Sequence, residues 1–334
     1  MGVRIIYGKP GSGKSRYCFS EIADLIKRKN EKKIYMITPE QFSFTAEKKL
    51  MDAINEKSVI NAEVVTLSRM AYRVLNEVGY EKNEYLSKCG KAMLIYSILD
   101  KNKKNLQFLG KTDENIDLSM SAITEFKKHG VSIEQLKNEK DSISDNYLKA
   151  KLSDMLLIYQ NFEDQIKNKY IDETDLLTIL AKNIEKTNIL ENSIIYLDEF
   201  AGFTKQEYEI LKIFIQKAKQ VNITICTDKL EYYTNPDSDI FYSNKQTFYK
   251  IIELAKENNL QIEEPVELKK EYRYKTEELK FLKENMYKNK STIFEQNVEN
   301  IHLFLAKNAY SEIENIAKEI TKLVRNQKLR YKDI

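Results

Sequence analysis

Residues 3–15 of this 334-residue chain, VRIIYGKPGSGKS, decide the fold. The β-branched run from Val3 to Tyr7 is typical of a buried strand, and the segment after Ser15 has the apolar spacing of a helix. Between them, GKPGSGKS matches the phosphate-loop pattern G-x-x-x-x-G-K-[ST] at every fixed position. The alternative is a chance glycine-rich turn, but the strand before the motif and the helix after it argue against a chance match.

The residue types of this loop fit the binding of ATP. Glycines let successive backbone N–H groups turn toward a phosphate, and the helix that begins near Lys14 adds its positive end. We predict that Lys14 reaches the β- and γ-phosphates and that the Ser15 hydroxyl is a ligand of Mg²⁺. The glycines expected to form the cradle are Gly8, Gly11 and Gly13.

A hydrophobic strand that ends in two carboxylates forms a second motif, IIYLDEF at residues 194–200. In this Walker B arrangement, Asp198 holds Mg²⁺ through water and Glu199 is the general base for the attacking water. The carboxyl ends of parallel strands meet at one sheet edge, which brings the pair to the phosphate loop. Phosphoryl transfer also needs a positive group at the γ-phosphate. Arg273 is a candidate, although an arginine on a charged helix explains it equally well.

Strand and helix patterns alternate from the phosphate loop to Val78, which predicts a parallel sheet with right-handed crossovers. We therefore expect an α/β lobe made of residues 1–78 and 193–264, in which the sheet pattern resumes. Between these parts only helical patterns occur, and they predict an all-helical insertion at residues 79–192. Residues 265–334 are expected to form a connector and the truncated beginning of a second lobe, with a strand at 301–306. The stop at LRYKDI, where another strand would begin, predicts a fragment.

The composition narrows the class of protein. An apolar fraction of 42% supports a core, and only 9 Gly and 4 Pro favour long helices. The net charge of +3 does not by itself indicate nucleic acid. The 3 cysteines and 2 histidines lack metal-ligand spacing, which excludes a His-based mechanism. No apolar run is long enough for a membrane span and the start is not a signal peptide, so we expect a cytoplasmic protein.

Three further segments carry a resemblance to a known family. They are ITPEQFSFTAEKKL (37–50), VVTLSRMAYRVL (64–75) and IIYLDEFAGFTKQEYEIL (194–211). Together with the early phosphate loop, they resemble the AddB family, which forms part of the bacterial ATP-dependent helicase/deoxyribonuclease AddAB and processes double-strand breaks for recombination. Its wider relatives are superfamily 1 helicases. The resemblance implies a RecA-like first lobe with a helical insertion, followed by the start of a second RecA-like lobe.

The same resemblance implies partners and site residues. The partners are the AddA subunit, single-stranded DNA and duplex DNA ends, and no membrane is implied. Thr38 and Thr66 lie where the wider family touches single-stranded DNA, and Arg273 lies in a segment similar to the motif whose arginine contacts the γ-phosphate. The family's nuclease and iron–sulfur cluster belong to its C-terminal region, and the three cysteines of this chain do not match the cluster ligands.

The chain also departs from the superfamily 1 pattern. No adenine-reading glutamine precedes the phosphate loop, Ala201-Gly202 replaces a Gln-Asp pair, and Thr227-Asp228 lacks the downstream glutamine that senses phosphate. Three hypotheses remain. The first is an ATP-binding scaffold that scans DNA for the Chi recombination signal while AddA unwinds. The second is an active DNA-dependent ATPase motor. The third is a small-molecule kinase, disfavoured by the large insertion and the lack of a recognisable lid.

Overall fold

The computed structural model describes residues 2–28, 31–55, 61–79, 84–109, 113–167, 169–231, 237–288 and 292–334. The chain divides into two compact units, Met1–Lys270 and Glu271–Ile334. The first unit contains a central parallel sheet, and the second is helical in its regular structure.

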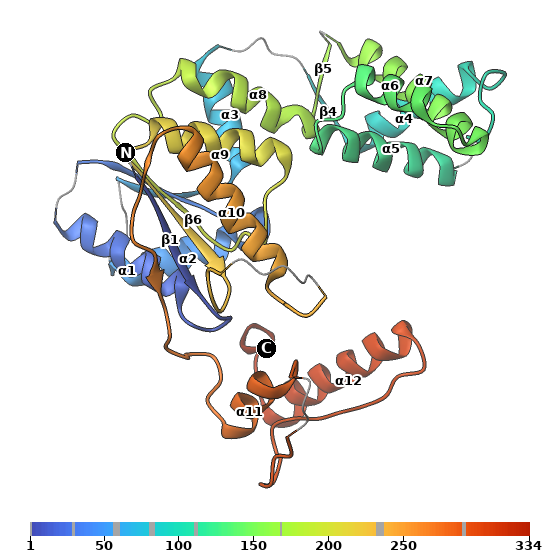
Figure 1. The fold of residues 1–334 in the computed structure, drawn as a ribbon. Coiled ribbons are helices and arrows are strands. Elements are labelled where there is room, and N and C mark those ends of the chain that lie inside the picture. Colours follow the sequence, from blue (N-terminus) through green and yellow to red (C-terminus); the bar gives the residue numbers. More distant parts are fainter. Residues whose placement is uncertain are drawn as a thin grey trace. The chain divides into compact units, whose positions relative to one another are not determined.

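The central sheet has seven strands in the order β3-β2-β6-β7-β1-β8, with β9 paired to β1 (Figure 1). Every recorded pair in it is parallel. This sheet confirms the predicted α/β fold. The strands are β1 (Gly2–Gly8), β2 (Lys33–Ile37), β3 (Ala62–Val65), β6 (Ser193–Leu197), β7 (Gln220–Cys226), β8 (Gln261–Ile262) and β9 (Val266–Glu267).

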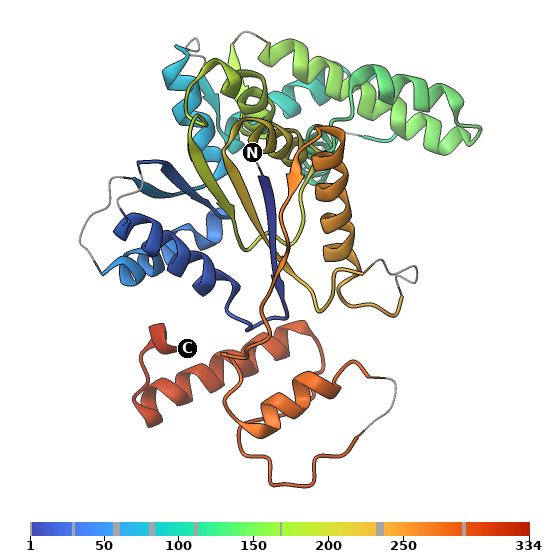
Figure 2. The same cartoon turned by 60° about the vertical axis from the view of Figure 1, so that its left-hand side comes forward.

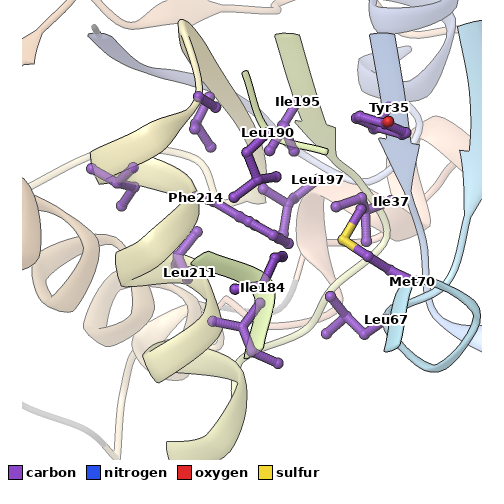
Figure 3. Packing of buried hydrophobic residues seen from close by; sticks show 14 of the residues in the cluster. Tyr35, Ile37, Leu67, Met70, Ile184, Leu190, Ile195, Leu197, Leu211 and Phe214 are labelled. Atoms are coloured by element: carbon purple, nitrogen blue, oxygen red, sulfur yellow. The ribbon is translucent and has the colours of Figure 1, made fainter. Parts of the chain in front are cut away.

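Helices cover both faces of this sheet, because its strands carry apolar side chains in alternation (Figure 2). In β2, Ile34 and Met36 join the cluster under α1 (Lys14–Lys27) and α2 (Ser43–Ile54). Tyr35 and Ile37 point to the opposite face and pack in the larger cluster (Figure 3). That face is covered by α3 (Leu67–Glu77), α8 (Leu176–Asn183), α9 (Lys205–Lys217) and α10 (Tyr242–Glu257).

The insertion has a separate apolar core built by four helices, as predicted. They are α4 (Lys88–Lys101), α5 (Asp113–Lys128), α6 (Ile133–Ser142) and α7 (Asn146–Ile166). Sequence patterns did not reveal β4 (Glu84–Leu86) and β5 (Tyr170–Asp172), which pair in parallel, because three residues are too short to show an alternation. Asp154 of α7 is buried and accepts the backbone N–H groups of residues 107, 108 and 109, which anchors that loop.

A buried ion cluster, which we call the Lys127 cluster, joins the insertion to the segment that leads back to the sheet. It consists of Lys91, Lys127, Glu163, Asp172 and Asp175. Lys127 lies 2.6 Å from Asp175, 2.7 Å from Glu163 and 3.2 Å from Asp172. Asp175 belongs to the short turn η2 (Glu173–Asp175), which is followed by α8 and η3 (Ile184–Lys186). The cluster therefore fixes the exit of the insertion.

The second unit contains α11 (Glu277–Asn285), α12 (Ala309–Gln327) and the turn η4 (Tyr331–Asp333). The predicted strand at residues 301–306 is wrong, since this segment is irregular. A strand needs a hydrogen-bonding neighbour, and the described part of this unit holds no other strand to pair with it. Leu303 and Leu305 are each 99% exposed. A second RecA-like lobe therefore stays a prediction. No helix in the described ranges is long and apolar enough to cross a membrane.

Candidate nucleotide-binding site

The glycine loop follows β1 at the carboxyl edge of the sheet, where the sequence placed it. Gly11 and Gly13 have φ angles of 85° and 84°, left-handed values that favour glycine. Gly8 is required for a different reason. A Cβ there would lie 2.6 Å from the backbone oxygen of Leu268, so only glycine fits beside this neighbouring segment.

The lysine and serine of the loop begin α1. Lys14 Nζ donates to the backbone oxygens of Gly8 at 2.9 Å and Lys9 at 3.1 Å, so its ammonium group lies over the loop. Ser15 Oγ donates to Glu199 Oε1 at 3.0 Å. This hydrogen bond joins the two predicted motifs, which are 184 residues apart in the sequence.

The acidic pair follows β6, which is separated from β1 by β7. Asp198 is 2% exposed and accepts a hydrogen bond from Thr224 Oγ1 at 2.6 Å. Burial raises the pKa of the Asp198 carboxyl, and its hydrogen bonds with Thr224 and Ser15 oppose the rise. Glu199 is exposed and has a φ of 64°, which is unfavourable for a residue with a side chain. The two carboxylates thus have different environments.

The oxygen donors of this site fit Mg²⁺. No group of three or more His, Cys, Asp or Glu side chains in the described parts of the chain can hold a metal ion. Magnesium in phosphate sites needs fewer, because one or two carboxylates plus nucleotide phosphates and waters complete its shell. Ser15 and Asp198 are the residues that would hold it.

Thr38 and Thr66 end neighbouring strands at the same edge, and both are 1% exposed. Thr66 caps α3, since its hydroxyl accepts the backbone N–H of Arg69 at 3.2 Å. Thr38 Oγ1 has no hydrogen-bond partner among the described residues. A DNA contact by either side chain stays a prediction, and it requires the hydroxyl to become exposed.

The segment after β7 holds a lysine that the sequence did not single out. Lys245 of α10 is buried and contacts Asp239 Oδ2 at 2.7 Å and Asp228 Oδ1 at 3.3 Å, the latter an ion pair by distance without hydrogen-bond geometry. Thr227 Oγ1 donates to the backbone oxygen of Lys229 at 2.9 Å. These contacts anchor the segment where a phosphate-sensing glutamine was missing. Nothing in the local sequence pattern distinguishes Lys245 from the other lysines.

Arg273 belongs to the second unit and is exposed. Its backbone N–H donates to Glu271 Oε1 at 3.2 Å. Its γ-phosphate role stays a prediction.

All three cysteines are free. Cys18 of α1 is buried, and burial raises the pKa of its thiol well above the usual range. Cys226 is half-buried at the end of β7, and Cys89 is exposed.

A parallel sheet with a phosphate loop after β1, an acidic pair after β6 and β7 between them defines a RecA-like α/β protein of the P-loop class. The family model described as ADDB, N-terminal, matches residues 5–283. The chain belongs to this family, and it represents the N-terminal region of AddB.

Curated relatives agree with this assignment. The chain is 42% identical to a protein of Clostridium tetani, 38% to one of Clostridium kluyveri and 36% to one of Thermoanaerobacter pseudethanolicus. Each relative is named as the subunit designated B of an ATP-dependent helicase/deoxyribonuclease. Each match covers 100% of this chain and 30% of the relative, so the chain spans a little under a third of their length.

Proposed function

We propose that this chain is the ATP-binding, helicase-like region of the AddB component of a bacterial helicase/nuclease that processes DNA double-strand breaks. The observation that carries the proposal is the hydrogen bond between Ser15 and Glu199. It brings the phosphate loop and the acidic pair into one site, which is the arrangement that phosphoryl transfer requires. By extension from the family, the partners are the AddA subunit, single-stranded DNA and duplex ends, in the cytoplasm.

Each side chain has a defined task in this site. Lys14 leaves the loop oxygens and neutralises the β- and γ-phosphates, while the loop N–H groups and the start of α1 bind the β-phosphate. Ser15 and Asp198 hold Mg²⁺, which bridges the phosphates and neutralises their charge. Glu199, the exposed carboxylate, is placed to accept a proton from an attacking water.

We further propose that the region is a DNA-scanning scaffold rather than a motor. A motor has to convert loss of the γ-phosphate into movement of neighbouring segments. Here the segment after β7 is held by Lys245 and Asp228, and Ala201-Gly202 offers no side chain for such a response. The buried ion pair supports a fixed rather than a switching segment. An active motor is the second candidate, and the presence of both Asp198 and Glu199 favours it.

Fluorescent mant-ATP binding and single-turnover hydrolysis, with and without single-stranded DNA, test these proposals. We expect binding that is lost in Lys14→Ala, and negligible turnover for this chain alone. DNA-stimulated hydrolysis that disappears in Glu199→Gln would establish the motor and overturn the scaffold. Absence of nucleotide binding by the wild-type chain would refute the ATP site itself. Lys9→Ala is the matched control, because Lys9 is exposed and only its backbone oxygen contacts Lys14.

A further inference from the structure

Three polar side chains lie in a row across the middle of the sheet at its carboxyl edge. Ile37, Leu197 and Ile223 are register partners on β2, β6 and β7. The residue after each of them therefore lies beside its neighbours, and the Asp198 N–H extends the ladder by donating to the oxygen of Ile37 at 3.0 Å. The row consists of Thr38, Asp198 and Thr224.

The two threonines that flank Asp198 differ in their hydrogen bonding. Thr224 Oγ1 donates to Asp198 Oδ1 at 2.6 Å. Thr38 Oγ1 is buried and has no partner among the residues that the structure describes. A buried hydroxyl without a partner is unfavourable, so it indicates a partner that is not part of the protein chain.

The space beside Thr38 fits such a partner. It is a cavity of about 20 Å³ whose polar lining includes Ser15, Thr38, Asp198 and Glu199. About one ordered water needs this much room, together with two to four polar partners. A nucleobase or a sugar-phosphate unit is far too large for it. The lining groups are also those that would hold Mg²⁺.

We propose that Thr38 is a positioning residue of the nucleotide site, whose hydroxyl hydrogen-bonds a water that Asp198 also holds in the coordination shell of Mg²⁺. This inference rests on the proposed ATP site. It gives Thr38 a role in metal-dependent nucleotide binding in place of the predicted contact with DNA. Asp198 would then be fixed from both sides, by Thr224 directly and by Thr38 through water.

Titrations of mant-ATP with Mg²⁺ and with EDTA, on the 334-residue chain, test the proposal. Thr38→Val keeps the shape of the side chain and removes the hydroxyl. We expect its affinity with Mg²⁺ to fall by roughly tenfold, about the effect of one hydrogen bond to a charged group. Its affinity in EDTA should equal that of the wild type, and Thr38→Ser should restore the Mg²⁺-dependent affinity. Thr45→Val is the control, because Thr45 lines the same cavity but is exposed.

Two further readouts separate this role from a structural one. With Mn²⁺ in place of Mg²⁺, electron paramagnetic resonance of the nucleotide complex should change in Thr38→Val and not in Thr45→Val. The melting temperature of Thr38→Val without nucleotide should equal or exceed that of the wild type, because an unpartnered hydroxyl contributes no stability.

Several results would overturn the proposal. They are an unchanged affinity with Mg²⁺, an equal loss with Mg²⁺ and with EDTA, and a lower melting temperature for Thr38→Val. An isolated structural water would give the first result. If the wild-type chain binds no nucleotide under either condition, the proposed function fails first and this inference fails with it.

Discussion

Replacement of Lys127 by methionine tests the Lys127 cluster. The lysine side chain is almost fully buried, and its ammonium group contacts Asp175, Glu163 and Asp172. Burial alone would lower the pKa of Lys127, but the three carboxylates raise it, so the ammonium group stays charged. Methionine fills a similar volume and keeps the packing against Phe162, over whose ring the ammonium lies. The change is therefore mainly electrostatic.

The magnitude follows from what remains after the change. Loss of one partner from a buried ion pair costs about 3–5 kcal/mol. Asp172 keeps Lys91 at 2.9 Å, while the Glu163 and Asp175 side chains are 33% and 30% exposed and can be hydrated in part. We therefore expect the lower end, a loss of about 3 kcal/mol in the free energy of unfolding. With an m-value of about 3 kcal/mol per M, the midpoint of urea unfolding falls by about 1 M.

The loss should depend on pH. Burial already raises the pKa of Glu163 and of Asp175, and Lys127 opposes that rise. Removal of Lys127 raises both pKa values further above those of the unfolded chain. The variant then binds protons more readily when folded, so it gains stability relative to the wild type as the pH falls. We expect the difference between the two proteins to be smaller at pH 5 than at pH 7.

Circular dichroism during urea unfolding, at both pH values, measures these differences. The control is Lys128→Met, because the Lys128 side chain is 45% exposed and its nearest carboxylate is the exposed Glu125. We expect that control to stay within about 0.5 kcal/mol of the wild type. Equal effects of the two substitutions, or a loss for Lys127→Met that grows on acidification, would refute the electrostatic reasoning.

Three further substitutions have definite expected outcomes. Gly8→Ala places a Cβ 2.6 Å from the Leu268 oxygen, so mant-ATP binding should be lost and stability should fall by roughly 1–3 kcal/mol; retained binding would contradict the close approach. Glu199→Gly releases a left-handed backbone and should raise the free energy of unfolding by about 1 kcal/mol, so a lower urea midpoint would speak against strain. Asp154→Ala leaves three N–H groups without their acceptor and should cost about 2–4 kcal/mol in urea unfolding. The exposed Asp164→Ala should change little, and equal losses would exclude the anchoring role.

Local patterns were sufficient for the phosphate loop and the acidic pair, because glycine spacing and a strand ending in carboxylates are encoded by neighbouring residues. The α/β class followed from the alternation of strand and helix patterns. Contacts between distant segments were not accessible in this way. Thr224 and Lys245 differ in no local respect from other threonines and lysines, and their partners come from other strands and helices. The failed strand at residues 301–306 shows the same limit, since its alternating apolar residues do not specify a neighbouring strand.

Cys18 gives the nucleotide site an intrinsic chemical reporter. Its thiol is fully buried in α1 and its raised pKa disfavours the reactive thiolate, whereas Cys89 is exposed. A thiol reagent therefore modifies Cys89 rapidly and reaches Cys18 only when α1 opens locally. Lys14 and Ser15 form the first turn of the same helix. Binding of ATP should thus slow the labelling of Cys18 while leaving that of Cys89 unchanged, so the ratio of the two rates measures site occupancy without an attached fluorophore.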